Sequence, residues 1–255
     1  MRAEISWGGD TYEADLTAPI RIAIDHTRAE PVNAFGLPDA QVRAFRVEGF
    51  TGRVAEGGSC NVDFLALHPH GNGTHTEGVG HIDPAHTPVE GLFERYFFRA
   101  LLLSCPLEGT PRQRQIAARG LQPFFDMPEA PEALVIRSLP NHPEKCATRY
   151  AGAFPPSLSP EAMRTIAGSP VRHLLVDLPS VDPEDDPRLA NHHLFWEYPH
   201  APRFDRSITE LIYVPDHVKD GLYLLQMCPP PIGKTDALPN QPVLYALSSN
   251  RKSSS

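Results

Sequence analysis

Proline is the feature that most constrains how this chain can fold. It accounts for 28 of the 255 residues, roughly twice the usage of about 5% in an average protein. A proline inside a helix removes a backbone hydrogen bond and clashes with the preceding turn, so long helices are disfavoured. Hydrophobic residues make up 41% of the chain, which is enough for a buried core. The composition therefore predicts a folded, loop-rich protein with short elements and argues against a helical bundle.

Short apolar runs between turn residues predict the strands. Ile20, Ile22 and Ile24 alternate with other residues, as expected for a half-buried strand. Segments 4–7 and 11–16 flank Gly8-Gly9-Asp10, which predicts a hairpin with a three-residue loop. Further strands are predicted at residues 42–47, 61–67, 97–104, 133–137, 171–178, 211–214, 222–227 and 243–247.

Helices are fewer. Ser159-Pro160-Glu161 combines a capping residue, a proline at the first helical position and an acid in the first turn, so a helix is predicted to begin there and to end near Gly168. Residues 111–119 are a second candidate helix. Strands outnumber helices, which predicts a mixed α/β fold built around β-sheet. Because neither a repeat nor a linker is present, we expect a single domain over residues 1–255 with a frayed tail at 248–255.

Charge and hydropathy narrow the choice of partners. The formal net charge is −8, which argues against a nucleic acid as the main partner. The N-terminus has no secretory signal, and the longest apolar runs are far shorter than the ~20 residues of a membrane helix. The cysteines are far apart and form no CxxC pair. We therefore expect a cytoplasmic protein that acts on a small-molecule substrate without a nucleic-acid or membrane partner.

Histidines are concentrated in one glycine-rich segment. Five of the 12 histidines lie within residues 68–86, namely His68, His70, His75, His81 and His86. Glycines directly after a predicted strand let the backbone turn tightly and bring several side chains together. His75, Glu77 and His81 provide two imidazoles and a carboxylate, which are ligand types suited to zinc, manganese or iron. The alternative is a polar surface loop, because imidazoles also form hydrogen bonds in ordinary loops.

Several blocks of the sequence resemble a known family. Residues 71–81, Gly-Asn-Gly-Thr-His-Thr-Glu-Gly-Val-Gly-His, resemble the H-x-G-T-H-x-D-x-P-x-H signature of the cyclase family, which is typified by metal-dependent bacterial kynurenine formamidases. Residues 175–183, Leu-Val-Asp-Leu-Pro-Ser-Val-Asp-Pro, are similar to its G-x-D-x-x-S-V-D-P stretch. Asn191-His192-His193 resembles its His-His pair, and residues 208–211 resemble its Glu-Asn-Leu. The similarity runs from about residue 61 to residue 247 and indicates a divergent member.

The resemblance implies a cyclase-like fold of β/β/α layers around a partly open β-barrel, in a homo-oligomer (a dimer or tetramer). It also implies a metal-dependent hydrolase of a small amide, formamide or lactam, similar to an arylformamidase, with zinc or manganese as the divalent metal. Residue by residue, His75, Glu77, His192 and Glu210 stand at the family's metal-ligand positions, with Glu77 in place of an aspartate. His81 stands at the position of the catalytic histidine.

One position departs from the family pattern. The family's first histidine, four residues before His75, falls on Gly71, which cannot bind a metal. His70 is adjacent and could replace it through a local bulge, although a shift of one residue along a strand reverses the direction of the side chain. Loss of this ligand could leave one metal instead of two, or none. A second hypothesis is therefore a metal-free small-molecule binding protein, or a non-hydrolytic enzyme, on the same fold.

Other residues are weaker candidates for a functional role. Trp196 closely follows the histidine pair and could line a pocket for an aromatic substrate, although indoles mainly supply buried area. Arg149 and Tyr150 could contact the substrate from a loop. Short polar side chains after a predicted buried strand are expected to shape the loop that follows it; these are Asp177, Ser180 and Asp182.

Overall fold

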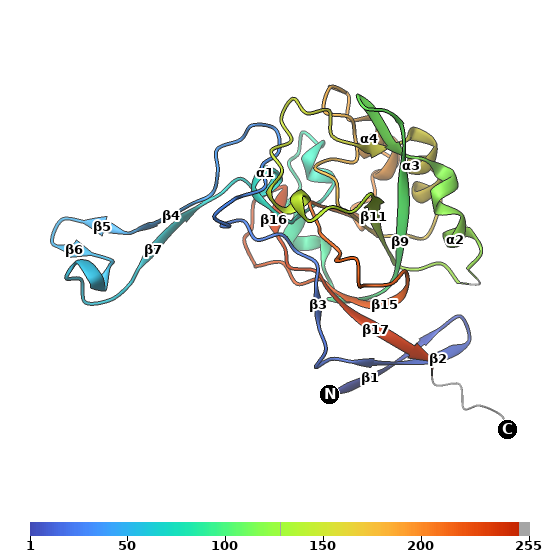
Figure 1. Ribbon diagram of the computed structural model, residues 1–255, viewed down its shortest axis with the longest axis horizontal. Coiled ribbons are helices and arrows are strands. Elements are labelled where there is room, and N and C mark those ends of the chain that lie inside the picture. The colour runs from blue at the N-terminus through green and yellow to red at the C-terminus, as the bar shows by residue number, and fades with distance from the viewer. Residues whose placement is uncertain (128, 250–255) are drawn as a thin grey trace.

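The computed structural model describes residues 1–127 and 129–249, and one large mixed sheet dominates it (Figure 1). Thirteen strands of the described residues belong to this sheet. Its main path runs in the order β1 (Arg2–Trp7), β2 (Asp10–Asp15), β17 (Val243–Ser249), β15 (Gly221–Gln226), β9 (Phe97–Thr110), β11 (Ala133–Leu139), β13 (His173–Val176), β14 (Ser207–Glu210), β8 (His75–Glu77) and β16 (Ala237–Pro239). Off this path, β3 (Ile20–Arg21) pairs with β17, and β10 (Gln113–Ile116) pairs with β9 and with β12 (Ser157–Leu158).

The mixed α/β fold built around β-sheet is confirmed. The path is open, since its end strands β1 and β16 do not pair with each other in the described residues. The central strands β9, β11, β13 and β14 are parallel. Both faces of this part are covered: Leu134 and Ile136 pack in one apolar cluster, and Val135 packs in another on the opposite side. Burial on both faces explains why β11 and β13 are mostly apolar in sequence.

The helices are short, as the proline content predicts. They are α1 (Pro69–Asn72), α2 (Gln122–Phe125), α3 (Pro160–Ala167) and α4 (Ala190–Phe195), with 3₁₀ turns η1 (Val54–Glu56), η2 (Val79–His81), η3 (Val89–Leu92), η4 (Ala118–Leu121) and η5 (Pro143–Ala147). The predicted start of α3 is confirmed, because the Ser159 side chain accepts a hydrogen bond from the Ala162 backbone N–H. Met163 and Ile166 of α3 pack onto the same cluster as Leu134.

The N-terminal hairpin is also confirmed, with a shorter turn than expected. Trp7 pairs with Asp10, which leaves only Gly8 and Gly9 between the strands. Both glycines have positive φ, at 61° and 82°, as a tight two-residue hairpin turn requires.

Three sequence-based expectations were wrong. Residues 111–119 are mainly not a helix, because β9 runs on to Thr110 and returns through a tight turn into β10, where Gln113 pairs with Thr110. Residues 211–214 are not a strand, since β14 ends at Glu210 and Leu211 has a φ of 54°. The tail does not begin at residue 248: Ser248 and Ser249 complete β17 and pair with β2. The rest of the expected tail, residues 250–255, lies outside the described residues.

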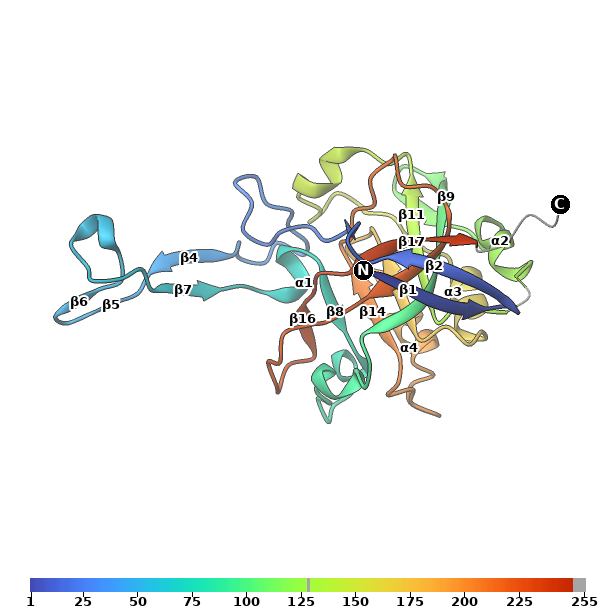
Figure 2. The ribbon, with the colours of Figure 1, turned by 90° about the horizontal axis from the view of Figure 1, so that it is seen from below.

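A two-stranded arm projects from the body (Figure 1), and the view from below in Figure 2 shows the same projection. It consists of the pair β4 (Gln41–Ala44) and β7 (Asp63–Ala66) and, further out, the pair β5 (Arg46–Val47) and β6 (Phe50–Thr51). The segment predicted as one strand at residues 42–47 is therefore two. No helix in the described part of the chain is both long and apolar enough to cross a bilayer.

Strand β8 brings the candidate site together. It lies between β14 and β16 and is antiparallel to both. In this register His75 lies opposite Glu210, and Glu77 lies opposite Ala237. Residues separated by more than 130 positions in the sequence thus become neighbours.

Candidate metal centre

Strands β8 and β14 provide three adjoining ligand candidates. His75 and Glu77 are two residues apart on β8 and therefore point to the same face of the sheet. Glu210 pairs with His75 across the two strands, so its side chain shares that face. The Nε2 atom of His75 lies 3.6 Å from Oε2 of Glu210. All three side chains are buried.

His192 reaches the same place from helix α4. The Asp182 carboxylate accepts hydrogen bonds from the backbone N–H groups of Asn191 and His192, at 2.7 and 3.1 Å, and so holds the first turn of this helix. It also lies 2.6 Å from Nδ1 of His192. The other ring nitrogen, Nε2, lies 2.9 Å from Oε1 of Glu77. Asp182, expected to shape a loop, therefore also orients a candidate ligand.

His70, and not Gly71, directs a side chain toward the cluster. Helix α1 places the His70 side chain with Nδ1 3.2 Å from Oε2 of Glu77. Gly71 lies on a different side of the helix, where an added β-carbon would approach Leu37 Cδ1 to 2.9 Å and the carbonyl oxygen of Ala34 to 3.1 Å. Because the segment is a turn of helix here and not a strand, a one-residue offset still reaches the site.

His81 lies at the end of η2, at the more open side of the cluster. Its Nδ1 atom lies 2.9 Å from Oδ2 of Asp236 and 3.8 Å from Oε2 of Glu77. The same Asp236 oxygen lies 2.8 Å from Nε2 of His70. The His81 ring centre is 4.5 Å from that of His70 and 5.5 Å from that of His192.

Each of the three candidate ligand histidines, His70, His75 and His192, has one ring nitrogen facing a hydrogen-bond partner and the other turned inward. The occupied nitrogens face Asp236 for His70, the Gly73 carbonyl for His75 and Asp182 for His192. Metal-binding histidines typically have this arrangement, because the second hydrogen bond fixes the ring and its tautomer. The inward nitrogen of His75 is buried without a hydrogen-bond partner, and so is Oε2 of Glu77.

The spacing of the inward atoms fits a divalent cation. Ligands at about 2.0–2.2 Å from a zinc ion lie roughly 3–3.5 Å from one another. The inward atoms of His70, His75 and His192 lie 3.2, 3.6 and 2.9 Å from the nearest carboxylate oxygen of Glu77 or Glu210. Glu77 is shared by two groups of potential ligands, His70–Glu77–His81 and His75–Glu77–Glu210, each with atoms within 4.8 Å of one another.

The buried carboxylates of Glu77 and Glu210 also favour a bound cation. Buried carboxylates are costly unless they are paired with positive charge. Burial alone would lower the pKa of His192, but the Glu77 charge and the hydrogen bond to Asp182 raise it to about 10. Burial likewise opposes protonation of His70, yet Asp236 and Glu77 raise its pKa to about 10. The imidazolium charges that balance these acids could be replaced by a divalent ion.

The three residues expected to contact a substrate lie outside the cluster of histidines and carboxylates. Trp196 is fully buried behind His192, with ring centres 5.4 Å apart, and its Nε1 donates to the Arg206 carbonyl. Arg149 pairs with Asp39 on the surface. Tyr150 is buried in a small apolar cluster with Ile24 and Leu211. Packing accounts for Trp196 and Tyr150, and the ion pair accounts for Arg149.

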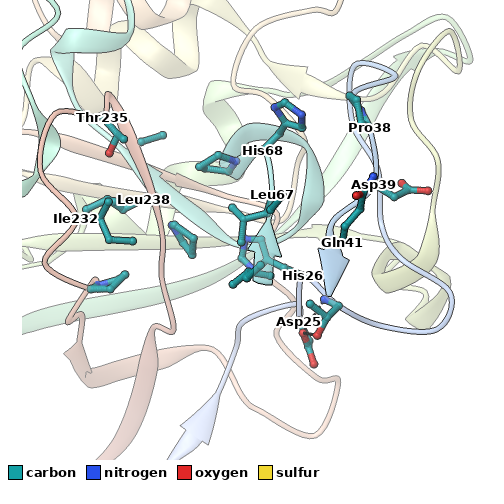
Figure 3. A pocket seen from close by; sticks show the side chains of 17 residues that line it. Asp25, His26, Pro38, Asp39, Gln41, Leu67, His68, Ile232, Thr235 and Leu238 are labelled. Carbon is teal, nitrogen blue, oxygen red and sulfur yellow. Dashed lines mark hydrogen bonds between the residues drawn. The ribbon is translucent and has the colours of Figure 1, made fainter. Parts of the chain in front are cut away.

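A cavity of about 840 Å³ adjoins the segments that carry the cluster. Its walls include the chain neighbours of His70 (His68 and Pro69) and of Asp236 (Thr235 and Ala237). Figure 3 shows its labelled side chains coming from residues 25–41, from Leu67-His68, from the loop before β16 and from β16 itself. The imidazole Nε2 of His26, which lines this cavity, is buried without a hydrogen-bond partner.

Sequence reasoning missed Asp236. It lies in a proline-rich loop that has no motif, and it enters the site only because β16 pairs with β8. No local signal in the sequence identifies it.

Comparisons with known proteins identify the family and the fold. The Cyclase family model matches residues 14–183. A solved structure described as a potential metal-dependent hydrolase with cyclase activity has a TM-score of 0.64 at 13% identity, over 89% of this chain and 97% of that one. Isatin hydrolase A from Labrenzia aggregata has a TM-score of 0.64 at 13% identity, over 90% and 93% of the two chains. A predicted metal-dependent hydrolase from Bacillus stearothermophilus has a TM-score of 0.60 at 15% identity, over 89% and 98%. At these low identities the structural similarity demonstrates the fold alone. The family match covers most of the chain. The protein therefore belongs to the cyclase family, as a divergent member.

Proposed function

We propose that the protein is a metal-dependent hydrolase that cleaves a carbon–nitrogen bond in a small amide, formamide or lactam, as an arylformamidase does. The observation that carries this proposal is the inward convergence of one nitrogen each from His70, His75 and His192 on Glu77 and Glu210. Imidazole and carboxylate together suit zinc or manganese. The hydrolase names of the structural neighbours support the same reaction class.

Two groups of side chains have separate roles in this proposal. His70, His75, His192, Glu77 and Glu210 hold the divalent ion, which when bound polarises a carbonyl and lowers the pKa of water. His81 is near the ion-binding atoms but at the more exposed side, where it can exchange protons with solvent and substrate. It would take a proton from water or give one to the leaving nitrogen.

The adjoining cavity supports a small-molecule substrate. Its volume of about 840 Å³ lies in the range of typical ligand sites, which are mostly apolar with a few polar groups. Leu67, Ile232 and Leu238 supply apolar wall, and His26 supplies a polar atom.

The metal-free alternative depended on the missing ligand at Gly71. His70 directs an imidazole nitrogen to within 3.2 Å of Glu77, which supports a complete set of ligands. We therefore favour the hydrolase over a metal-free binding protein.

The arm supports a homo-oligomer, which we propose to be a dimer of this chain. An isolated two-stranded ribbon is marginally stable in water. Seven of its large apolar side chains are nevertheless exposed, namely Val42, Phe45, Val47, Val54, Val62, Phe64 and Leu65. A second copy would cover them, and the same arm can contact its equivalent symmetrically in a two-fold dimer.

Hydrolysis assays on a panel of aryl formamides and cyclic amides test the proposed function. Protein loaded with zinc or manganese is expected to hydrolyse at least one of them, to lose activity with a chelator and to regain it when the metal is restored. His75→Ala should be inactive, whereas Asp15→Asn, which alters a surface carboxylate of β2 that accepts a hydrogen bond from the Thr17 backbone N–H, should retain activity. Turnover that persists unchanged in metal-depleted protein would contradict the proposal.

A further inference from the structure

Asp236 connects two histidines that come from different segments. Its Oδ2 atom lies 2.8 Å from Nε2 of His70 and 2.9 Å from Nδ1 of His81. Asp236 thus contacts a candidate ligand and the candidate proton carrier through one oxygen.

The backbone fixes Asp236 against β8. The Gly78 N–H donates to the Asp236 carbonyl at 3.2 Å, and the Val89 N–H donates to the Thr235 carbonyl at 3.0 Å. The next residue, Ala237, pairs with Glu77 in the sheet. The carboxylate is therefore held in a defined place relative to the ligands on β8.

A carboxylate facing an imidazole determines which ring nitrogen carries the hydrogen. An ionised carboxylate only accepts hydrogen bonds, so the nitrogen nearest to it must donate. In His81 that nitrogen is Nδ1, which leaves Nε2 of the neutral ring with the free lone pair. In His70 the nitrogen facing Asp236 is Nε2, so Nδ1, which faces Glu77, is the nitrogen that would give up its hydrogen to bind a cation.

We infer that Asp236 is a positioning residue that fixes the tautomer and orientation of His81 for proton transfer, and of His70 for metal binding. This inference rests on the proposed function for the roles of the two histidines. The same oxygen serves both rings, so the proton carrier keeps a constant position relative to the ion. The Nε2 atom of His86 lies 3.9 Å from Oδ1 of Asp236. This distance is too long for a hydrogen bond, so His86 does not compete with His70 and His81 for the carboxylate.

Histidine ring nitrogens can be observed directly by NMR in full-length protein labelled with ¹⁵N-histidine. In wild-type protein loaded with Zn²⁺, His81 is expected as a single tautomer with its hydrogen on Nδ1. In Asp236→Ala the acceptor is gone, and the His81 signals should move to averaged values of the two tautomers. Asp236→Asn keeps an acceptor oxygen without the charge and should give an intermediate result, and Asp15→Asn, in the N-terminal hairpin, should match wild type.

Zinc titration of the same variants separates a positioning role from direct ligation. Asp236→Ala should bind as many zinc ions per chain as wild type, with an affinity about 10–100-fold lower because His70 loses its orienting partner. Fewer zinc ions per chain in Asp236→Ala would make Asp236 a ligand and overturn the inference. So would a His81 tautomer that is the same with and without the Asp236 carboxylate. If wild-type protein bound no zinc, the proposed function would fail, whereas the His81 tautomer in metal-free protein would still test Asp236.

Discussion

The Nδ1 atom of His70 lies 3.2 Å from Oε2 of Glu77, so an imidazole occupies the site although the family's first histidine is replaced by Gly71. Helix α1 makes this possible, because the Asn72 side chain accepts a hydrogen bond from the His68 backbone N–H at 2.7 Å and closes the turn around His70. The candidate ligand therefore lies one residue earlier in the sequence than the family's first histidine and still reaches the cluster.

A substitution at His70 should lower metal affinity, whereas an added histidine at Gly71 should not raise it. His70→Ala removes a ligand, so zinc affinity should fall by more than the ~10–100-fold that loss of an outer-shell partner costs. Gly71→His should not raise zinc affinity, because its β-carbon would be directed at Leu37 and Ala34. Gly71→Ala is the matched control for crowding. Calorimetric zinc titration measures all three, and tighter binding by Gly71→His than by wild type would show that the site lacks a ligand.

His75 and His81 should respond differently to removal. His81→Ala should retain its bound metal while kcat falls about 10²–10⁴-fold, the usual contribution of a general acid or base. His75→Ala should lose metal and activity together, because His75 directs its buried, unpartnered Nε2 atom at the ion position. Metal analysis and amide hydrolysis of the two variants make the comparison. Equal loss of metal in both would make His81 a ligand.

Stability in mild acid should depend on His173, which is remote from the metal centre. Burial lowers the pKa of His173 from 6.5 to about 3, and its ring stacks on Phe93 and accepts or donates a hydrogen bond with Ser207. Between these pKa values the unfolded chain binds a proton that the folded chain does not. The free energy of unfolding therefore falls as pH drops below about 6.5, by at most roughly 1.4 kcal/mol per pH unit from this group.

Urea unfolding of His173→Asn measures that dependence. The variant keeps a hydrogen-bonding group near Ser207 but cannot gain a charge, so it should be less stable than wild type at pH 7.5 and should lose less stability on acidification to pH 4.5. The same loss in both proteins would show that His173 does not contribute to the acid sensitivity.

The arm should determine the oligomeric state. Val42→Asp combined with Val47→Asp places charges on two exposed apolar positions of the arm and should convert a dimer into monomers. Phe204→Asp is the control, because Phe204 is equally exposed on the body, at 54% for all three residues. Sedimentation analysis gives the masses. A monomeric wild type, or equal dissociation by the control, would contradict the role of the arm.

The sheet could be predicted from the sequence because its signals are local. Alternation and apolar runs located β9, β11, β13, β15 and β17, and the Ser159 cap located α3. The prediction at residues 111–119 failed because propensity within that segment cannot show that Thr110 and Gln113 form a hairpin. The pairing of β10 with β9 determines the structure of that segment.

Only part of the candidate site could be predicted from the sequence. The spacing of His75, Glu77 and His81 indicates metal chemistry, and resemblance to the family adds His192 and Glu210. The roles of Asp182 and Asp236 depend on contacts across the sheet and across α4, which spacing does not encode. Trp196 was weighed as a substrate contact because it is close to His192 in sequence, and the fold instead buries it behind that ring.

Metal content of the purified protein, prepared without added metal, tests the central claim most directly. The account predicts at least one divalent transition-metal ion per chain in the wild type, and a large loss in His75→Ala, whose fold can be verified independently by circular dichroism. A folded wild-type protein that contains no such ion, and that takes up none when zinc or manganese is supplied, would contradict the account.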